Sequence, residues 1–304
     1  MCQFPFQQQG DPLSPKLFIA VLENIFRKLD WKQKGIKIGD CYLHHLKFAD
    51  DIVLLAETPT KLEDMIHSLD QESSKIGLEM NASKTKVMTN SNKVPIRSRG
   101  NNIEYVNSYI YLGKQVSFSR SSNEEEIERR ISITWKKFWS LKEILKGNYD
   151  LSMKKIVLDT CLLPCLLYGC QTWAYTKKVK QKIRTTQRSM ERSILQIRKI
   201  QKIRSDTIRQ KTKITDALTQ ALKLKWQWAG HITRLIDNRW TIQTTIWKGP
   251  AGKRNIGRPI RRRADDITQI AGTDWMNLGK DKEAWKKMEE AFTQGGVHFS
   301  KHVN

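Results

Sequence analysis

The chain has 304 residues, 39% of them hydrophobic, and a formal net charge of +23 with a pI near 9.9. It is long enough and apolar enough for two or three modules with cores of their own, which excludes a disordered polymer. A charge of this size makes a polyanion the leading class of partner, and both nucleic acid and an anionic membrane qualify.

The positive charge is distributed unevenly along the chain. Residues 1–110 hold 14 Lys and Arg against 13 Asp and Glu, a net charge of +1, whereas residues 111–304 hold 40 against 18, a net charge of +22. The second part also holds nine of the ten tryptophans, all except Trp31. Aromatic rings among cations suit contact with nucleic acid and equally suit an ordinary core. Both interpretations stay open for each tryptophan.

The cysteines and the most hydrophobic window bear on the compartment. The five cysteines are an odd, clustered set without a secretory signal or a zinc-finger spacing, so we expect free, buried thiols in an intracellular, reducing compartment. Residues 156–175 include Asp159 and Pro164, which predicts a buried helix interrupted at the proline and no membrane span. Basic clusters such as residues 261–263 suit nuclear entry and nucleic-acid contact equally.

The first 116 residues predict a mixture of helices and strands. Apolar residues at helical spacing predict a helix over residues 14–30, behind Pro12 and Pro15. Residues 35–56 predict strands with a turn at Gly39-Asp40, and a helix follows over residues 62–76. Residues 106–118 predict a further strand pair. The fold class is therefore α+β.

Within this part, "LKFADDIVLLA" places two adjacent carboxylates, Asp50 and Asp51, between apolar runs. The pattern predicts a strand, a tight Asp-Asp turn and a second strand. Adjacent carboxylates on such a turn suit a hard divalent cation, and a pair of such ions promotes phosphoryl transfer. On the pair alone, a plain hairpin turn remains the favoured alternative.

From residue 121 the pattern becomes helical. Asn123 has capping-box spacing with Glu126, and a basic amphipathic helix follows to about Leu145. Residues 177–213 predict a second basic helical tract with fourteen Lys and Arg and two acidic residues. For each of these cations a solvated face is the simpler interpretation. Residues 249–263 are rich in glycine, proline and cations and predict a loop between two short helical pieces.

Four motifs in order give the chain a family resemblance. "QQGDPLSPKLF", "KFADDIVLLA", "GLEMNASKTKVM" and "YIYLG" resemble motifs B, C, D and E of the reverse transcriptases of non-LTR retrotransposons. The resemblance continues through "LPCLLYGCQTW", "SMERSIL", "KLKWQWAGHI", "GRPIRRRADDI" and "AGTDWM", although Gln171 and Arg263 replace the family's usual glutamate and tryptophan. It covers essentially the whole chain.

The resemblance implies roles for particular residues. Asp50 would be the metal-binding carboxylate of motif C and Asp51 its less direct partner, with Mg²⁺ or Mn²⁺ as the cofactor. The remaining roles would be nucleotide contact by Gln9, Gly10, Pro12 and Lys84 or Lys86, and primer binding by Tyr111, Leu112 and Gly113. A solvated loop position is an equal alternative for the two lysines. The implied partners are an RNA template, a DNA primer and deoxynucleotides, and no membrane.

The resemblance also predicts an architecture. Residues 1–116 would be a partial polymerase palm, with a small antiparallel sheet backed by helices and either a sheet edge or an apolar face left uncovered. Residues 117–205 would be a helical thumb-like region, and residues 206–304 a basic, tryptophan-rich carboxy-terminal region. The chain starts ten residues before Asp11, so the motif A aspartate, the fingers and the endonuclease of the family are expected to be absent.

Two functions remain open from the sequence. The first is an RNA-directed DNA polymerase that works by two-metal nucleotidyl transfer, of which this chain is a fragment. The second is a catalytically inactive nucleic-acid-binding remnant of the same element. They differ in the number of carboxylates at the site, because catalysis in this family uses a third one from motif A.

Overall fold

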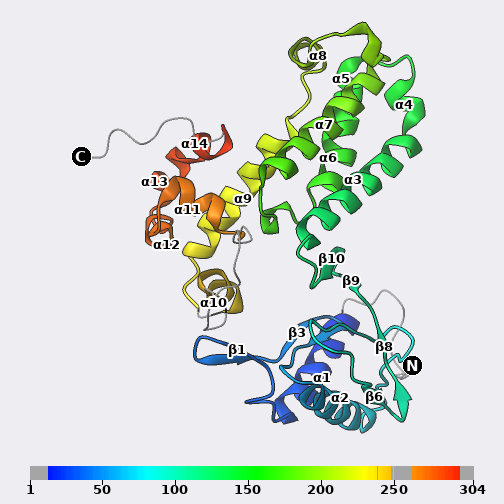
Figure 1. Ribbon diagram of the computed structural model, residues 1–304, viewed down its shortest axis with the longest axis vertical. Helices are drawn as coiled ribbons and strands as arrows, with labels where there is room; N and C mark the ends of the chain where they lie inside the picture. The colour runs from blue at the N-terminus through cyan, green and yellow to red at the C-terminus, as the bar shows by residue number, and fades with distance from the viewer. Residues whose placement is uncertain (1–12, 238, 248, 250–261, 295–304) are drawn as a thin grey trace. The chain divides into compact units, whose positions relative to one another are not determined.

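The computed structural model describes residues 13–237, 239–247, 249 and 262–294. The chain divides into two compact units, Met1–Phe118 with Gln243–Arg254 and Ser119–Ile242 with Asn255–Asn304 (Figure 1). We call them unit 1 and unit 2 and describe each by itself. The described part is rich in helices with small sheets in unit 1, which agrees with the expected α+β class.

Unit 1 combines two helices with short strands. Its helices are α1 (Ser14–Lys28) and α2 (Pro59–Ser74). Its strands are β1 (Ile36–Ile38), β2 (Cys41–Leu43), β3 (His45–Phe48), β4 (Asp51–Leu54), β5 (Lys86–Val87), β6 (Arg97–Ser98), β7 (Asn101–Asn102), β8 (Glu104–Tyr105), β9 (Ser108–Tyr111) and β10 (Lys114–Ser117). The predicted helices, the Gly39-Asp40 turn between β1 and β2, and the strand pair at residues 106–118 are all confirmed.

The sheets of unit 1 differ from the single small antiparallel sheet that we expected. The described strands form separate pairs: β1–β2, β3–β4, β6–β7 and β9–β10 are antiparallel, whereas β5–β8 is parallel. Most of these strands have only two to four residues, too few to recruit a third neighbour by a continuous ladder. The alternation of apolar and polar residues predicts strands, but not which strands pair.

The core of unit 1 lies between the β3–β4 hairpin and the two helices. Ile52 and Leu54 of β4 pack onto α1 and α2, in the cluster that holds buried Phe26 and Met65. Pro59 opens α2, and Thr58 before it accepts the Lys61 backbone N–H, so the helix begins three residues earlier than predicted. This packing fixes β4, and with it the acidic pair at the start of the strand.

Unit 2 is helical in the part that the structure describes. Its first helices are α3 (Ser122–Ser140), α4 (Lys142–Lys146), α5 (Leu151–Val157), the π-helical turn η1 (Leu158–Leu162), α6 (Leu163–Leu167) and the 3₁₀ turn η2 (Cys170–Thr172). The next are α7 (Lys177–Ile194), the 3₁₀ turn η3 (Lys199–Gln201), α8 (Ser205–Thr212), α9 (Ala217–Thr233) and α10 (Trp240–Ile246), whose last residues belong to unit 1. The last are α11 (Asp265–Ala271), α12 (Trp275–Leu278), α13 (Lys282–Lys287) and α14 (Glu289–Thr293).

Of two local predictions for unit 2, one is wrong and one is confirmed. Asn123 does not cap α3, because the helix begins at Ser122 and the Asn123 amide instead exchanges two 3.0 Å hydrogen bonds with the backbone of Ala174. The predicted basic helical tract over residues 177–213 is confirmed and consists of α7, the 3₁₀ turn η3 and α8, with Gln196 after α7 at a φ of +57°. The Asn123 side chain bonds the Ala174 backbone and therefore does not cap its own helix. The spacing of nearby residues cannot predict a partner so distant in the sequence.

The hydrophobic window at residues 156–175 is a broken helix inside unit 2. The π-helical turn η1 precedes Pro164, which lies in the first turn of α6. Such a turn absorbs the hydrogen bond that proline cannot make, so the predicted interruption is confirmed. In the described part of the chain, no helix is both long and apolar enough to cross a membrane.

Three of the carboxy-terminal motifs meet in the core of unit 2. The Lys225 ammonium is fully buried and donates to the Asp266 carboxylate and to the Trp173 carbonyl, both at 2.7 Å. Trp226 stacks on Trp285 with ring centroids 4.0 Å apart, and each indole N–H donates to the other residue's carbonyl. These motifs therefore hold the fold together, which explains their residue types without any ligand.

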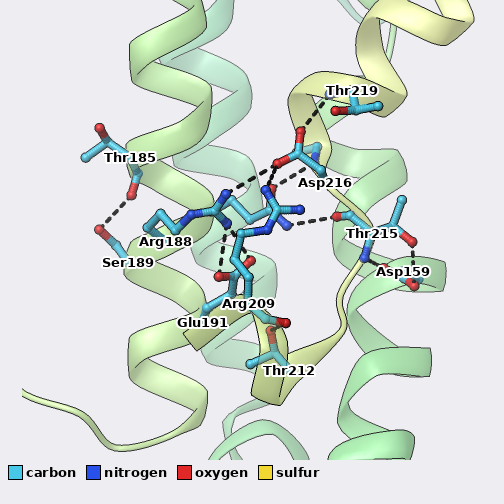
Figure 2. Close-up of polar contacts among 12 residues, drawn as sticks. Asp159, Thr185, Arg188, Ser189, Glu191, Arg209, Thr212, Thr215, Asp216 and Thr219 are labelled. Atoms are coloured by element: carbon cyan, nitrogen blue, oxygen red, sulfur yellow. Dashed lines mark hydrogen bonds and ion pairs between the residues drawn. The ribbon is translucent and has the colours of Figure 1, made fainter. Parts of the chain in front are cut away.

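A polar network in unit 2 ties α7, α8 and the start of α9 together (Figure 2). Arg188 pairs with fully buried Glu191 and with Asp216, and Arg209 also pairs with Asp216, which caps α9 through the Thr219 N–H. Burial acts to raise the pKa of Asp216, but hydrogen bonds from Thr219 and Arg209 outweigh it and lower that pKa. The network pairs these charged side chains with one another. It also holds α8 in place, at the end of the basic segment that follows α7.

Candidate functional site

The acidic pair lies on the β3–β4 hairpin of unit 1. Phe48 pairs with Asp51 in the register, so the two turn residues are Ala49 and Asp50, and Asp51 is the first residue of β4. The predicted Asp-Asp turn is wrong by one residue. Ala49 has a φ of +53°, a left-handed conformation that costs a residue with a Cβ about 1 kcal/mol. Strain of this kind often accompanies functional turns.

Both carboxylates are exposed. The side of the hairpin away from the helices carries Leu46 and Phe48, of which Phe48 is 63% exposed. The expected uncovered apolar face is thus present beside the acidic pair. An apolar surface around two carboxylates lowers the local dielectric constant for any ligand that covers it, which strengthens charge interactions there.

The opposite side of the hairpin is held by ionic and aromatic contacts to α1. Lys47 pairs with Glu23 and lies 4.9 Å from the centre of the Phe26 ring. His45 packs on the same ring, and burial, followed by repulsion from His44 and Lys47, lowers the pKa of His45 to about 4. These contacts anchor β3 and leave Asp50 and Asp51 at the free end of the hairpin.

The predicted primer-binding residues form the turn of the β9–β10 hairpin. Tyr111 pairs with Lys114, and Leu112 and Gly113 between them both have positive φ, of 47° and 74°. Two consecutive residues with positive φ define a type I′ turn, the turn that suits the twist of a two-residue hairpin. Burial raises the pKa of Tyr111, and the negative charge of Asp51 raises it further.

The two candidate lysines differ in their surroundings. Lys86 lies on β5 and donates to Glu104 on β8 at 2.6 Å, and this hydrogen bond lowers the pKa of Glu104. Lys84 is exposed, in a turn closed by hydrogen bonds to Asn81. Lys84 is thus the more available cation of the two. The other predicted nucleotide contacts, Gln9, Gly10 and Pro12, lie outside the described residues.

Asp50 and Asp51 can supply part of the oxygen coordination that a divalent cation needs. Mg²⁺ favours one or two carboxylates, with water and substrate phosphates in the other positions, and two exposed adjacent carboxylates fit that chemistry. Within the described ranges, no group of three or more His, Cys, Asp or Glu side chains could hold a metal ion by itself. The pair therefore suits a cation that is shared with a phosphate-bearing ligand.

Sequence reasoning missed several residues that matter structurally. The Lys225 and Asp266 pair was not singled out, although a lone lysine within an apolar helix face is a signal for such a pair. Arg263 stands where the family resemblance leads us to expect a tryptophan. Its guanidinium carbon lies 4.1 Å from the centre of the Trp228 ring, so a planar cation stacks there. Burial lowers the pKa of Arg263 to about 10.

The chain is similar to known proteins over most of its length. Residues 4–116 match the family model for reverse transcriptase (RNA-dependent DNA polymerase). The chain is 33% identical over 269 residues to a transposon-derived protein of Caenorhabditis elegans, across 82% of this chain and 96% of that protein. The chain therefore belongs to the reverse transcriptase family.

Further relatives specify the branch of that family. The chain is 26% identical over 203 residues to the Pol polyprotein of the R2 retrotransposable element of Popillia japonica, across 62% of this chain and 32% of that one. It is 40% identical over 77 residues to the corresponding polyprotein of Drosophila melanogaster, across 25% and 7%. The match is thus to the reverse transcriptase portion of non-LTR retrotransposons, and the chain spans a third or less of these R2 polyproteins.

Proposed function

We propose that this chain is the palm-derived and nucleic-acid-holding portion of an RNA-directed DNA polymerase. The observation that carries the proposal is the β3–β4 hairpin, which presents Asp50 and Asp51 exposed at its free end in a chain that belongs to the reverse transcriptase family. Residues 1–116 would be the partial palm, residues 117–205 the thumb-like region and residues 206–304 the basic carboxy-terminal region.

The residues have distinct tasks in this proposal. Asp50 and Asp51 hold Mg²⁺ or Mn²⁺, which when bound lowers the barrier to attack of a primer hydroxyl on a deoxynucleotide and to loss of pyrophosphate. Tyr111 and the Leu112-Gly113 turn hold the primer end beside that position. Lys84 contacts the phosphates of the nucleotide, where a cation stabilises the departing pyrophosphate. The template RNA lies along the basic surface of the remainder.

Primer extension on an RNA template with Mg²⁺ tests this function. Extension by the unmodified chain that is lost in Asp50→Asn and kept in Asp40→Asn would support the polymerase role of Asp50. Asp40 is a matched control because it is an exposed aspartate in the two-residue turn of the neighbouring hairpin β1–β2. Equal extension by both variants would contradict the role of Asp50.

Binding of Mn²⁺, followed by electron paramagnetic resonance, gives a readout that does not depend on activity. We expect Asp50→Asn to weaken Mn²⁺ binding in the presence of a deoxynucleotide, and Asp40→Asn to leave it unchanged. Equal binding by the unmodified chain and Asp50→Asn would remove the metal-holding role even if extension occurs.

The second candidate function is nucleic-acid binding without catalysis. The concentration of charge favours it, because residues 111–304 carry a net +22 and the acidic pair lies in the nearly neutral part. Salt-sensitive binding without any primer extension, in the same preparation and with the same oligonucleotides, would favour this candidate over the polymerase.

A further inference from the structure

Trp139 is the exposed tryptophan of this chain. All ten tryptophans lie among the described residues; five are buried, four are partly buried, and Trp139 at the end of α3 is 50% exposed. Its ring stacks on Trp135 at 6.4 Å and meets the edge of fully buried Phe138 at 5.5 Å. One side of the indole is thus held against the core, and the remainder faces solvent in a defined orientation.

Lysines surround this ring. Lys146 on α4 places its ammonium 5.4 Å from the centre of the Trp139 ring, and Lys137 and Lys142 are exposed nearby in sequence. Within the part of the chain that the structure describes, none of these three lysines forms an ion pair with a carboxylate. Their charges are therefore available to an external anion, unlike those of Lys178 and Lys182, which pair with glutamates of α3.

A second aromatic ring follows directly after α4. Tyr149 is 52% exposed and lies against Gly147, where a Cβ would come within 3.3 Å of the tyrosine ring and 2.1 Å of the Glu143 carbonyl. A side chain at position 147 would therefore displace both the end of α4 and the ring. The glycine allows the chain to turn tightly, so that Tyr149 lies just beyond Lys146.

The basic segment after α7 joins the same end of unit 2. The Gln196 side chain donates to the Lys146 carbonyl at 3.2 Å, and α4 packs against α3, α5 and α7 (Figure 1). Arg198, Lys199 and Lys202 follow, all exposed. The network of Figure 2 holds α8, where this segment ends. We call Trp139, Tyr149, Lys142, Lys146, Arg198 and Lys199 the α4 patch.

We propose that the α4 patch of unit 2 binds a single strand of nucleic acid. Exposed rings on a rigid support stack with bases of any sequence, and unpaired cations around them contact the phosphates between those bases. A duplex hides its base faces, so rings presented in this way favour a single strand. The proposal rests on the nucleic-acid binding proposed for the basic part and deepens it, because it names the residues and the single-stranded form that they bind, and the patch needs neither nucleotide nor metal ion.

Fluorescence anisotropy of a labelled single-stranded RNA of about 12 nucleotides, with the full chain and with EDTA present, tests the proposal. One stacked base contributes about 1–3 kcal/mol, so we expect Trp139→Ala to weaken binding roughly tenfold to a hundredfold. Trp139→Phe keeps a ring and should retain most of the affinity. Tyr168→Ala removes a ring that is also 50% exposed but lies outside the patch, and should bind nearly as the unmodified chain does.

The charged part of the patch has its own control. Lys142→Ala with Lys146→Ala should weaken binding and make its salt dependence shallower, by about one unit of slope for each phosphate that the variant no longer neutralises. Lys32→Ala with Lys37→Ala removes equal charge from exposed positions of unit 1 and should change binding little.

Three outcomes would overturn the proposal. The first is equal binding by Trp139→Ala and the unmodified chain. The second is a duplex of the same length that competes as well as the single strand. The third is displacement of the RNA by anionic phospholipid vesicles at matched charge, which would assign the patch to a membrane. The vesicles are included because Ile200, next to Lys199, is an apolar residue that is 82% exposed. Because EDTA abolishes polymerisation, failure here is distinct from failure of the polymerase proposal.

Discussion

At the scale of single residues, charged side chains are exposed at the acidic pair and buried in an ion pair at Lys225. Asp50 and Asp51 are exposed on a hairpin, where a cation can reach them. Lys225 and Asp266 are 0% and 6% exposed and form an ion pair inside unit 2. Two predictions belong to this scale.

The first concerns the buried ion pair. Lys225→Met leaves the Asp266 carboxylate buried without its cation, which we expect to lower the free energy of unfolding by about 3–5 kcal/mol. The double variant with Asp266→Leu should be more stable than Lys225→Met, because no uncompensated charge remains. Urea unfolding followed by tryptophan fluorescence measures both, and a double variant as unstable as the sum of its single variants would contradict this.

The second concerns His45. Burial lowers its pKa to about 4 in the folded chain, so the unfolded chain, with an ordinary imidazole, binds the proton more tightly. The stability contributed by neutral His45 is present above about pH 6.5 and is lost as the pH falls toward 4. His45→Gln should make stability less pH-dependent in that window. Urea midpoints across the window report the difference.

At the scale of elements, turns and close approaches set where the motifs lie. The hairpin turns at Ala49 and Leu112 both use left-handed backbone at residues other than glycine. In unit 2, Gly230 allows α9 to approach α13, because a Cβ there would lie 2.4 Å from the Trp285 indole nitrogen. The approach places Trp226 and Trp285 in their stack.

Substitution of Gly230 tests this approach. Gly230→Ala forces the Trp285 ring to move although it is stacked and hydrogen-bonded, so we expect a loss of about 1–3 kcal/mol in the free energy of unfolding. Gln227→Ala, at an exposed position one turn earlier on α9, should cost far less. Thermal unfolding of the two variants distinguishes them, and equal midpoints would show that the ring yields without cost.

At the scale of the whole molecule, charge separates the two functions. Residues 1–110 are nearly neutral and carry the acidic pair, whereas the remainder is strongly basic. A polyanion held by that remainder releases counterions, so its affinity should fall steeply as salt rises. Titrations at several salt concentrations measure this, and an affinity that does not depend on salt would contradict the assignment of the basic part to nucleic acid.

Much about this protein follows from the sequence by itself. Periodicity predicted the helices α1, α2 and α7 and the hairpins β1–β2 and β9–β10, because local spacing decides such elements. The order of four motifs predicted the family, which the comparisons confirm. The separation of charge between the two parts is likewise a property of sequence alone.

Tertiary structure decided what depends on contacts between distant residues. The register of β3 with β4 put Asp50 in the turn and Asp51 in the strand. Asn123 bonds Ala174 instead of its own helix. Tertiary structure also decides which tryptophans are buried and which are exposed. Sequence spacing cannot distinguish buried Trp226 from exposed Trp139, because burial depends on the residues that the fold packs around each ring.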